Sequence, residues 1–403
     1  MTETPLALGG FKVVEFGDFI SSAYAGKLLG DLGADVVKVE PPAGDSARRH
    51  GPFANDEPHA EKSGLYLFLN SNKRGVTLDL EHAEGRGLLR ELAGWADLVI
   101  HNQRPGDLRR WGLDYESLAA EQPELVMSSI SVFGHGTPHE DWAATALTAT
   151  AASGLARYIG DPDRSPLWLP YSAADIQGGI HGAIAAMLAL RARKSTGEGQ
   201  HAWVSIVEVM GTTLRGDSLP QYIYAGQLRG RNGAHNHSFY PWQVAAAKDG
   251  YIEVITMVDD QWSRFMELMG NPPWKDDERL ENRWFSSEWA DELDAFWHPW
   301  LAERGKAELS QLFKANHIPF QPVHDVSEVA ESEHLAGRDF FQDVEHPQAG
   351  SYRTLGAPYR LSLTPWSIRR PPPLLGQHND EILGELLGHD ATELASLAEM
   401  GAL

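Results

Sequence analysis

Lys12–Phe16 reads KVVEF and Asp35–Val39 reads DVVKV, with the segment Ser22–Leu32 between them. Short runs rich in valine predict buried strands, and the intervening segment is long enough for about three helical turns. A strand, a helix and another strand in this order indicate a βαβ unit, whose two strands are parallel. This stretch therefore predicts an α/β fold.

The same alternation continues through the first half of the chain. Further elements are expected at Val76–Leu78 (extended), Glu84–Ala96 (helix), Leu98–His101 (strand), Leu125–Ile130 (strand) and Ile176–Arg193 (a long helix rich in Ala and Leu). Strands that alternate with helices predict a parallel sheet whose two faces are covered. Ligands of such sheets, often nucleotides, bind at the carboxyl ends of the strands.

The second half of the chain has a different character. Two β-like stretches in Trp242–Val258 flank Lys248-Asp249-Gly250, which predicts a hairpin turn. Helical patterns follow at Gln261–Met269, Trp289–Glu303 and Lys306–Asn316. We therefore expect a large Rossmann-like α/β domain over residues 1–225, a smaller α+β domain over 235–335, and a tail over 336–403 that returns to the large domain.

Composition narrows the classes of function. The 403 residues carry a net charge of −22, so nucleic acid or an anionic membrane is not expected as a partner, because both would be repelled. No secretory signal is expected at the start, which has no basic segment followed by an apolar one. Cysteine is absent, which excludes a thiolate nucleophile and a cysteine metal site. We expect a cytoplasmic protein that binds no metal.

Short motifs alone identify no activity. Gly26, Gly30 and Gly33 lie inside a helical pattern and do not form the dinucleotide fingerprint, which argues against a nicotinamide-dependent dehydrogenase. The chain has no P-loop, no G-x-S-x-G elbow and no H-E-x-x-H. His135, between two glycines, is interpreted as a loop histidine rather than a metal ligand. These patterns predict an α/β protein with a nucleotide-containing ligand and no more.

Longer stretches, taken in order, carry a family resemblance. They are VVEFGDFISSAYAGKLLGDLGADVVKVEPPAGDSAR from Val13, LNSNKRGVTLDL from Leu69, ADLVIHNQRPGDLRRWG from Ala96, ADIQGGIHGAIAAMLALRARKSTGEGQ from Ala174, KDGYI from Lys248 and GAPYRLSLTPW from Gly356. Together they resemble the class III CoA-transferases, a family that includes formyl-CoA and carnitine CoA-transferases and is related to alpha-methylacyl-CoA racemase. The resemblance implies a Rossmann-like domain with an inserted smaller domain, and an interlocked homodimer. It also implies acyl-CoA and a carboxylic acid as substrates, with no tightly bound cofactor.

The resemblance places the nucleophile of the transferases at Asp175, just before the predicted helix Ile176–Arg193. The structural alternative is that Asp175 only caps this helix, and the two roles are compatible. An ionised aspartate can attack a thioester carbonyl without a separate base. Gly178 and Gly179 leave room either for an approaching thioester or for a neighbouring helix, and the sequence does not separate these alternatives.

The expected CoA-binding residues follow two predicted strands. The resemblance implies that Asn102, Gln103 and Arg104 line the CoA site, and that Arg110 meets a phosphate. It also places Leu78 against the adenine, although a leucine in a strand is first a core residue. Arginines in such a segment could otherwise be solvated loop charges.

Some positions depart from the relatives. Ile20 replaces a glutamine of formyl-CoA transferases, which argues against formyl or oxalyl specificity. Thr145 and Ala146 stand where the racemase has His-Asp, so one side of the acid/base pair that racemisation needs is missing. Racemisation and CoA binding without catalysis remain the alternatives. Gly233 and His235 are weak candidates for the glycine loop of formyl-CoA transferases.

Overall fold

The computed structural model of the protein describes residues 5–214, 218–284 and 289–403. The chain divides into two compact units. Unit 1 consists of Met1–Ser153, Leu169–Thr212 and His334–Leu403, and unit 2 of Gly154–Trp168 and Thr213–Glu333. The second unit therefore starts earlier than the small domain expected at 235, and it also takes in a short segment that precedes the long helix.

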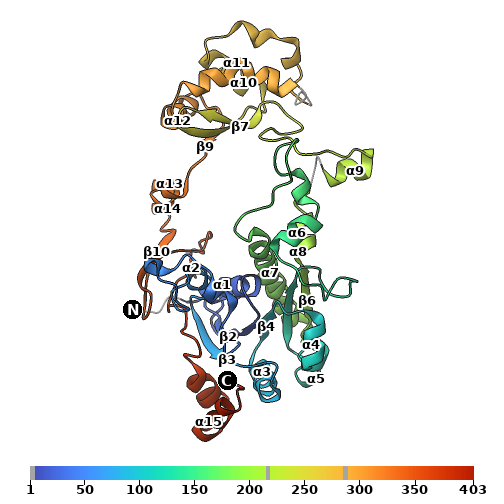
Figure 1. Ribbon diagram of the computed structural model, residues 1–403, viewed down its shortest axis with the longest axis vertical. Helices are drawn as coiled ribbons and strands as arrows, with labels where there is room; N and C mark the ends of the chain where they lie inside the picture. Colours follow the sequence, from blue (N-terminus) through green and yellow to red (C-terminus); the bar gives the residue numbers. More distant parts are fainter. Residues whose placement is uncertain (1–4, 215–217, 285–288) are drawn as a thin grey trace. The chain divides into compact units, whose positions relative to one another are not determined.

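Unit 1 is built on a six-stranded sheet of parallel strands in the order β3-β2-β1-β4-β5-β6 (Figure 1). The strands are β1 (Lys12–Phe16), β2 (Asp35–Glu40), β3 (Lys73–Thr77), β4 (Leu98–His101), β5 (Val126–Ser131) and β6 (His201–Ser205). The order runs outward in one direction from β1 and in the other from β4, as in doubly wound nucleotide-binding sheets. The predicted parallel α/β fold is confirmed.

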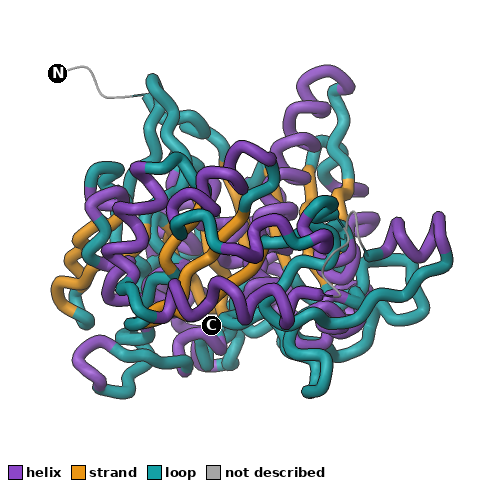
Figure 2. The backbone as a smooth tube through the Cα atoms, turned by 90° about the horizontal axis from the view of Figure 1, so that it is seen from above, coloured by secondary structure: helices purple, strands orange, loops and turns teal. Residues whose placement is uncertain are grey.

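Helices cover both faces of this sheet, whose strands are orange between purple helices in Figure 2. They are α1 (Ser21–Asp31), α2 (Gly64–Leu69), α3 (Ala83–Trp95), α4 (Pro105–Trp111), α5 (Tyr115–Glu121), α6 (Ala146–Ala152), α7 (Ala173–Thr196) and α8 (Ile206–Gly211). Val14 and Phe16 point to the face where they form a core with Leu88 and Leu92 of α3. Successive strand residues point to opposite faces, so the other face is left for α1 and α7.

Two elements differ from the sequence predictions. β3 begins at Lys73, three residues before the extended segment expected at Val76, because its first residues are polar and hide the strand pattern. β6 was not predicted at all. Its sequence HAWVS contains a histidine and lies at the sheet edge, where half-exposed residues weaken the apolar signal.

The C-terminal tail belongs to unit 1. It contains a hairpin of β10 (Phe341–His346) and β11 (Gly350–Leu355), a π-helix η7 (Asp380–Leu386) and α15 (Ala391–Glu399). The Asn72 N–H donates to the Arg370 carbonyl at 3.1 Å, and the Thr77 N–H donates to Asn379 Oδ1 at 3.0 Å. Ile382 is fully buried in the same core as Val14. The tail thus completes the β3 side of the sheet.

Unit 2 has a small antiparallel sheet packed against helices. Its strands are β7 (Trp242–Ala247), β8 (Gly250–Ile255) and β9 (Phe320–Pro322), and its helices are α9 (Leu219–Ala225), α10 (Asp259–Leu268), α11 (Ala290–Ala302), α12 (Lys306–Ala315) and α13 (Val326–Ala330). Helix α14 (Glu333–Ala336) begins at the last residue of unit 2 and continues into unit 1. The predicted hairpin at Lys248-Asp249-Gly250 is confirmed, since β7 and β8 pair on either side of it. Phe265, Trp297 and Phe313 form the centre of the core.

Among the described residues, α7 is the one helix long and apolar enough to cross a membrane by length and composition alone. A buried helix passes the same test. A side chain at Gly182 would meet Ile130 of β5 at 2.3 Å, and one at Gly179 would meet the main chain of α1 at Ser21 at 2.7 Å. This close packing against sheet and helix accounts for the apolar composition of α7.

Candidate functional site

The carboxyl ends of β1 and β4 lie side by side where the strand order reverses. Phe16, the last residue of β1, is paired with His101, the last residue of β4, and their rings stack with centroids 5.1 Å apart. In doubly wound sheets the ligand binds in the crevice at this point. The residues that follow, Gly17 onward and Asn102 onward, therefore make the floor of the candidate site.

Asn102 joins the two loops of this floor. Its Nδ2 donates to the Asp18 carbonyl at 2.6 Å and to Ser21 Oγ at 3.1 Å, and its Oδ1 accepts from the Asp18 N–H at 2.9 Å. A Cβ on Gly17 would lie 2.3 Å from the same Oδ1, so only glycine fits there. The amide of Asn102 is therefore committed to holding the loop after β1. Its expected contact with CoA stays a prediction.

Gln103 and Arg104 lead into α4. Arg104 is the residue before the helix, whose first position is Pro105. The Arg104 side chain is about half exposed and pairs with Asp107 at 2.9 Å. The described residues make no hydrogen bond to the side chain of Gln103. Both residues leave the strand end at the expected place, and their role toward CoA remains untested.

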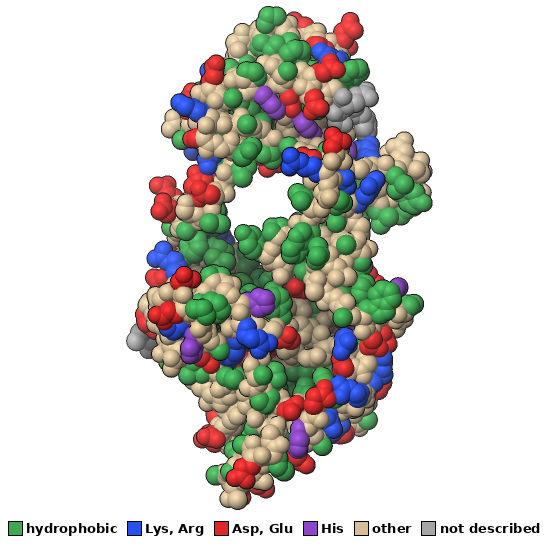
Figure 3. Space-filling model, in the orientation of Figure 1, with side chains coloured by type: hydrophobic (Ala, Val, Ile, Leu, Met, Phe, Trp, Pro, Cys, Tyr) green, Lys and Arg blue, Asp and Glu red, His purple; other side chains and the backbone are tan. Residues whose placement is uncertain are grey.

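Arg110 is also half exposed and already paired with acidic residues. Its guanidinium donates to both oxygens of Glu81, at 2.6 and 2.8 Å, and holds the pKa of that carboxyl at about 2. It pairs with Asp107 as well, at 3.3 Å. Exposed ion pairs add little to stability, so an incoming phosphate could replace these partners. In Figure 3, Lys and Arg side chains likewise lie scattered among acidic ones.

Leu78 follows β3 and is almost completely buried, at 1% exposure. It belongs to the core that contains Val76 and Leu89. Its N–H donates to the Glu40 carbonyl at 2.8 Å. Any contact between Leu78 and an adenine would therefore involve the main chain, because the side chain faces the core.

Asp175 lies in the first turn of α7. The helix begins at Ala173, three residues before the predicted start, and Ser172 occupies the N-cap position. The interpretation of Asp175 as an N-cap is therefore wrong, because the residue is already inside the helix. The next residue, Ile176, packs against the cluster formed by Ile20 and its neighbours. This contact brings the start of α7 to the loop after β1.

The carboxylate of Asp175 is partly buried and unpaired. Within residues 5–214, 218–284 and 289–403, no hydrogen bond or ion pair reaches it. Burial raises the pKa of Asp175 to about 6, because a charged carboxylate loses water there without gaining a cation. Other acidic side chains at this end of the sheet, such as Asp18 and Asp45, hold main-chain N–H groups. Asp175 differs from them because its carboxylate holds no group of the described residues.

The glycines after Asp175 serve helix packing. A Cβ at Gly178 would lie 2.8 Å from the Ile206 side chain, and one at Gly179 would lie 2.7 Å from the Ser21 carbonyl. Both positions face neighbouring elements at distances that real side chains do not reach. Of the two alternatives left by the sequence, the structure favours close packing.

His101 and Ser129 were missed by the sequence analysis. His101 is fully buried, and its Nδ1 accepts from the Gln103 N–H at 3.2 Å, which leaves the ring proton on Nε2. Nε2 then donates to Ser129 Oγ at 2.6 Å, and the Ser129 hydroxyl donates to His201 Nε2 at 2.7 Å. This chain fixes the main chain at Gln103. The sequence could have indicated this chain of hydrogen bonds, because a histidine at the last position of a buried strand needs polar partners.

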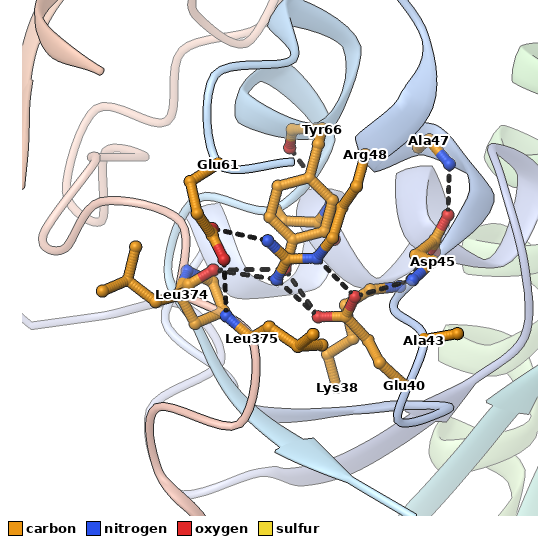
Figure 4. A network of polar contacts seen from close by, with 12 residues as sticks. Lys38, Glu40, Ala43, Asp45, Ala47, Arg48, Glu61, Tyr66, Leu374 and Leu375 are labelled. Atoms are coloured by element: carbon orange, nitrogen blue, oxygen red, sulfur yellow. Dashed lines mark hydrogen bonds and ion pairs between the residues drawn. The ribbon is translucent and has the colours of Figure 1, made fainter. Parts of the chain in front are cut away.

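A buried network of charges supports the loop after β1 (Figure 4). Lys38 Nζ contacts Glu15 at 3.0 Å and Asp45 at 2.8 Å, and all three side chains are fully buried. Figure 4 labels Lys38 and Asp45 of this network. Asp45 Oδ1 in turn accepts from the Phe19 N–H at 3.1 Å. Removing one partner of such a network would leave a buried charge unpaired, which is strongly destabilising. The sequence could have indicated this network, because Glu15 and Lys38 are charged residues within the predicted buried strands.

Arg48 extends this network to the C-terminal tail. Its Nε donates to Glu40 at 2.7 Å, and Nη2 donates to the Tyr66 hydroxyl at 2.6 Å and to the Pro373 carbonyl at 3.1 Å (Figure 4). The tail is thereby tied to the elements that carry the candidate site.

The positions that depart from the relatives, Ile20, Thr145 and Ala146, all lie in unit 1. Ile20 is buried against Ala23 and Leu69, so it offers no polar group. Thr145 is the N-cap of α6 and forms a capping box with Thr148, while Ala146 is buried. Neither position supplies the acid or base that a racemase needs.

His235 lies in unit 2, in the loop before β7. Its Nε2 contacts Asp294 at 2.6 Å, and Asp294 also accepts from the Tyr240 hydroxyl at 2.7 Å and from Gln243 at 2.9 Å. His235, Asp291 and Asp294 are close enough together to hold a metal ion. The oxygens of Asp294 are, however, already used by these donors, which favours a structural role. Gly233 has a φ of +59°, which suits a turn.

Comparisons with known proteins agree with this geometry. Residues 8–379 match the model of CoA-transferase family III. The chain is 31% identical over 395 residues to a succinyl-CoA–D-citramalate CoA-transferase of Chloroflexus aurantiacus, covering 98% of this chain and 97% of the relative. It is 30% identical over 382 residues to a succinate–glutarate CoA-transferase of Agrobacterium fabrum, covering 94% and 95%.

Similar proteins are also found among solved structures. A CaiB/BaiF family protein of Brucella suis superimposes with a TM-score of 0.83 at 31% identity, covering 94% of this chain and 99% of that one. Sequence and fold thus agree with these relatives over nearly the whole length of the chain. The chain belongs to family III of the CoA-transferases.

Proposed function

We propose that this enzyme transfers CoA from an acyl-CoA donor to a carboxylic acid through a covalent intermediate on Asp175. The observation that carries the proposal is the partly buried carboxylate of Asp175, which has no partner among the described residues. A buried carboxylate without partners is costly in a structural role, and it is reactive as a nucleophile. Its place at the start of α7, beside the loop after β1, supports attack on a thioester bound at the strand ends.

The chemistry needs four acyl transfers. The Asp175 carboxylate attacks the donor thioester, the C–S bond breaks, and a mixed anhydride forms while CoA leaves as thiolate. The thiolate attacks the aspartyl carbonyl of the anhydride, giving an aspartyl-CoA thioester and releasing the donor acid. The acceptor carboxylate then attacks this thioester to form a second anhydride and free the thiolate again. Finally the thiolate attacks the acceptor carbonyl, which yields the new acyl-CoA and restores Asp175.

No step consumes water, so the site must keep water from the anhydride and thioester. The amino end of α7 favours negative charge near Asp175, which suits the oxyanion formed at each attack. Arg104 and Arg110 would meet the phosphates of CoA, and Asn102 would hold the loop beneath it. Leu78 and Gln103 complete the expected contacts.

The substrates are proposed as short dicarboxylic acids. The two relatives described above are named for transfers that involve succinyl-CoA or succinate and a second acid. Succinyl-CoA is therefore the first donor to test, against acceptors that include citramalate and glutarate, with the products read by mass spectrometry. Ile20 argues against oxalate as the acceptor.

The covalent step has a direct test. After incubation with donor acyl-CoA, hydroxylamine should trap an adduct on the peptide that contains Asp175, because anhydrides and thioesters both react with it. Asp175→Asn keeps the size of the side chain and should lose transfer activity by at least about 10³-fold. Glu198→Gln, at the other end of α7 and exposed, is the control and should keep full activity. Full activity in Asp175→Asn, with deamidation excluded by mass spectrometry, would contradict the proposed mechanism.

A further inference from the structure

A chain of hydrogen bonds crosses the sheet of unit 1 and ends at the loop that follows β4. It joins His101, the last residue of β4, to Ser129 of the neighbouring strand β5 and to His201 of the edge strand β6. His101 and Ser129 are fully buried and are partners in the register of β4 and β5, whereas His201 is partly exposed. The edge of the sheet is thereby connected to the loop that is expected to bind CoA.

The hydrogen bonds of this chain run in one direction. Nδ1 of His101 accepts from the Gln103 N–H at 3.2 Å, so the proton of the neutral ring is on Nε2. Nε2 donates to Ser129 Oγ at 2.6 Å, and the Ser129 hydroxyl then donates to His201 Nε2 at 2.7 Å. Burial lowers the pKa of both histidines, that of His201 to about 4, so both rings are neutral at pH 7. The bond of the Gln103 N–H thus requires an acceptor at position 201.

A donor at position 201 would reverse the chain. The Ser129 hydroxyl would accept from that donor and would donate to Nε2 of His101. The proton of the His101 ring would then be on Nδ1 and would face the Gln103 N–H, so two donors would meet. Both side chains are fully buried, and bulk water therefore cannot supply the missing acceptor. The Gln103 peptide would have to turn away from His101.

The Gln103 peptide lies between two side chains of the candidate site. Asn102 precedes it and holds the loop after β1 through Asp18 and Ser21. Arg104 follows it and is the residue before the first turn of α4. A turned Gln103 peptide would displace both side chains, and a displacement of about 1 Å is enough to weaken an oriented site.

We propose that His201, on the edge strand, is a positioning residue for CoA binding: by accepting from Ser129 it keeps the loop that follows β4 in its binding conformation. His201 acts through His101 and Gln103 rather than by contact with CoA. The inference rests on the proposed function, because it takes CoA to bind at this loop. If the chain served only to satisfy buried polar groups, CoA affinity would not depend on the direction of its hydrogen bonds.

Two substitutions at position 201 separate the direction of the chain from its presence. Glutamine can accept from Ser129 through Oε1, whereas lysine can only donate. In calorimetric titration with CoA at pH 7, His201→Lys should weaken binding by at least about tenfold and His201→Gln by less than about threefold. His334→Lys, at an exposed position, is the control for the added charge and should bind CoA like the wild type. Wild-type affinity in His201→Lys, or an equal loss in both His201 variants, would overturn the proposal.

A second position shows whether a loss in His201→Lys comes from the chain or from a damaged fold. His101→Asn supplies its own acceptor for the Gln103 N–H, because an asparagine side chain can bond to the main chain two residues on. In the His101→Asn background, His201→Lys should therefore change CoA affinity by less than about twofold. A tenfold loss in that background as well would contradict the proposal.

The same titrations distinguish this inference from the proposed function. Absence of CoA binding by the wild type would refute both. Wild-type binding that His201→Lys leaves unchanged would refute the positioning role of His201 alone.

Discussion

At the scale of single residues, the environment of Asp175 sets the chemistry. A carboxylate in water is a weak nucleophile, because its charge is well solvated and its pKa is low. Burial at the start of α7 raises the pKa of Asp175 to about 6. The group is still mostly ionised at pH 7, yet it is more basic and less hydrated than an ordinary aspartate. The same burial that costs stability therefore favours attack on a thioester.

This environment predicts the pH dependence of transfer. The reactive form is the carboxylate, so kcat/KM should fall about tenfold per pH unit as the pH drops below about 6. Initial rates between pH 4.5 and 8 would measure this fall in kcat/KM. Circular dichroism at each pH would show that the fold persists. A fall in kcat/KM with its midpoint near pH 4, the pKa of an unperturbed aspartate, would contradict the role of burial.

The stability of the Asp175→Asn variant is a second test of the burial of this carboxylate. The folded pKa is above the unfolded one, so the folded protein binds the proton more tightly, and its stability falls as the pH rises from about 4 to about 6. At pH 7 the buried charge costs up to about 3 kcal/mol, which asparagine would relieve. Thermal unfolding should show the variant more stable at pH 7 and equal to the wild type near pH 3.5.

At the scale of elements, the contact between α7 and α1 positions the nucleophile. Gly179 faces the Ser21 carbonyl, and Ile176 packs against Ile20 at the start of α1. The two helices can approach closely only because α7 has glycine at this turn. The distance of Asp175 from the crevice at β1 and β4 therefore depends on a residue that carries no chemistry.

Gly179→Ala should separate these helices. The added Cβ would lie 2.7 Å from the Ser21 carbonyl, which is main chain and cannot swing aside. We expect a loss of about 1–3 kcal/mol in unfolding free energy and at least about tenfold in kcat. Gly94→Ala on α3 is the matched control, because nothing lies within 4 Å of its Cβ, and it should be neutral or stabilising by up to about 1 kcal/mol. If both variants behave alike, the close approach has no role in positioning Asp175.

At the scale of the whole molecule, large apolar side chains remain exposed on each unit. On α7, Leu188 is 66% exposed, and on α9, Ile223 is 63% and Tyr224 is 88% exposed. Exposed apolar clusters of this kind mark protein–protein contacts. The family resemblance implies an interlocked homodimer, although some named relatives consist of alpha and beta subunits.

We therefore predict a homodimer in solution. Sedimentation equilibrium of the purified chain should give twice the 44.4 kDa of one chain, with no monomer at micromolar concentration. Leu188→Glu would place a charge on the exposed side of α7 and should favour the monomer, with Glu198→Gln, just beyond the end of this helix, as the control. A single monomeric species of the wild type would refute this assembly.

The sequence by itself determined the class of fold, the family and the order of the elements. Valine-rich runs such as KVVEF and DVVKV need burial on both faces, and helices between them can provide it only in a parallel α/β sheet. The sequence also predicted the end of the strand that precedes Asn102 and Arg104, because local patterns locate strand termini. Apolar periodicity left β6 and the start of α7 undetected, since an edge strand is half exposed and the first residues of α7, Ala173-Ala174-Asp175, include no large apolar side chain.

Only the tertiary structure decided which polar groups are paired. Asp175, Asp45 and Asp31 look alike in the sequence, yet Asp45 is bound to Lys38, Asp31 to Lys27, and Asp175 to no described residue. Likewise His101 and His201 are 100 positions apart and meet only through Ser129 on the strand between them. Pairing depends on contacts between residues distant in the chain. It therefore becomes visible, together with the raised pKa of Asp175, only once the chain has folded.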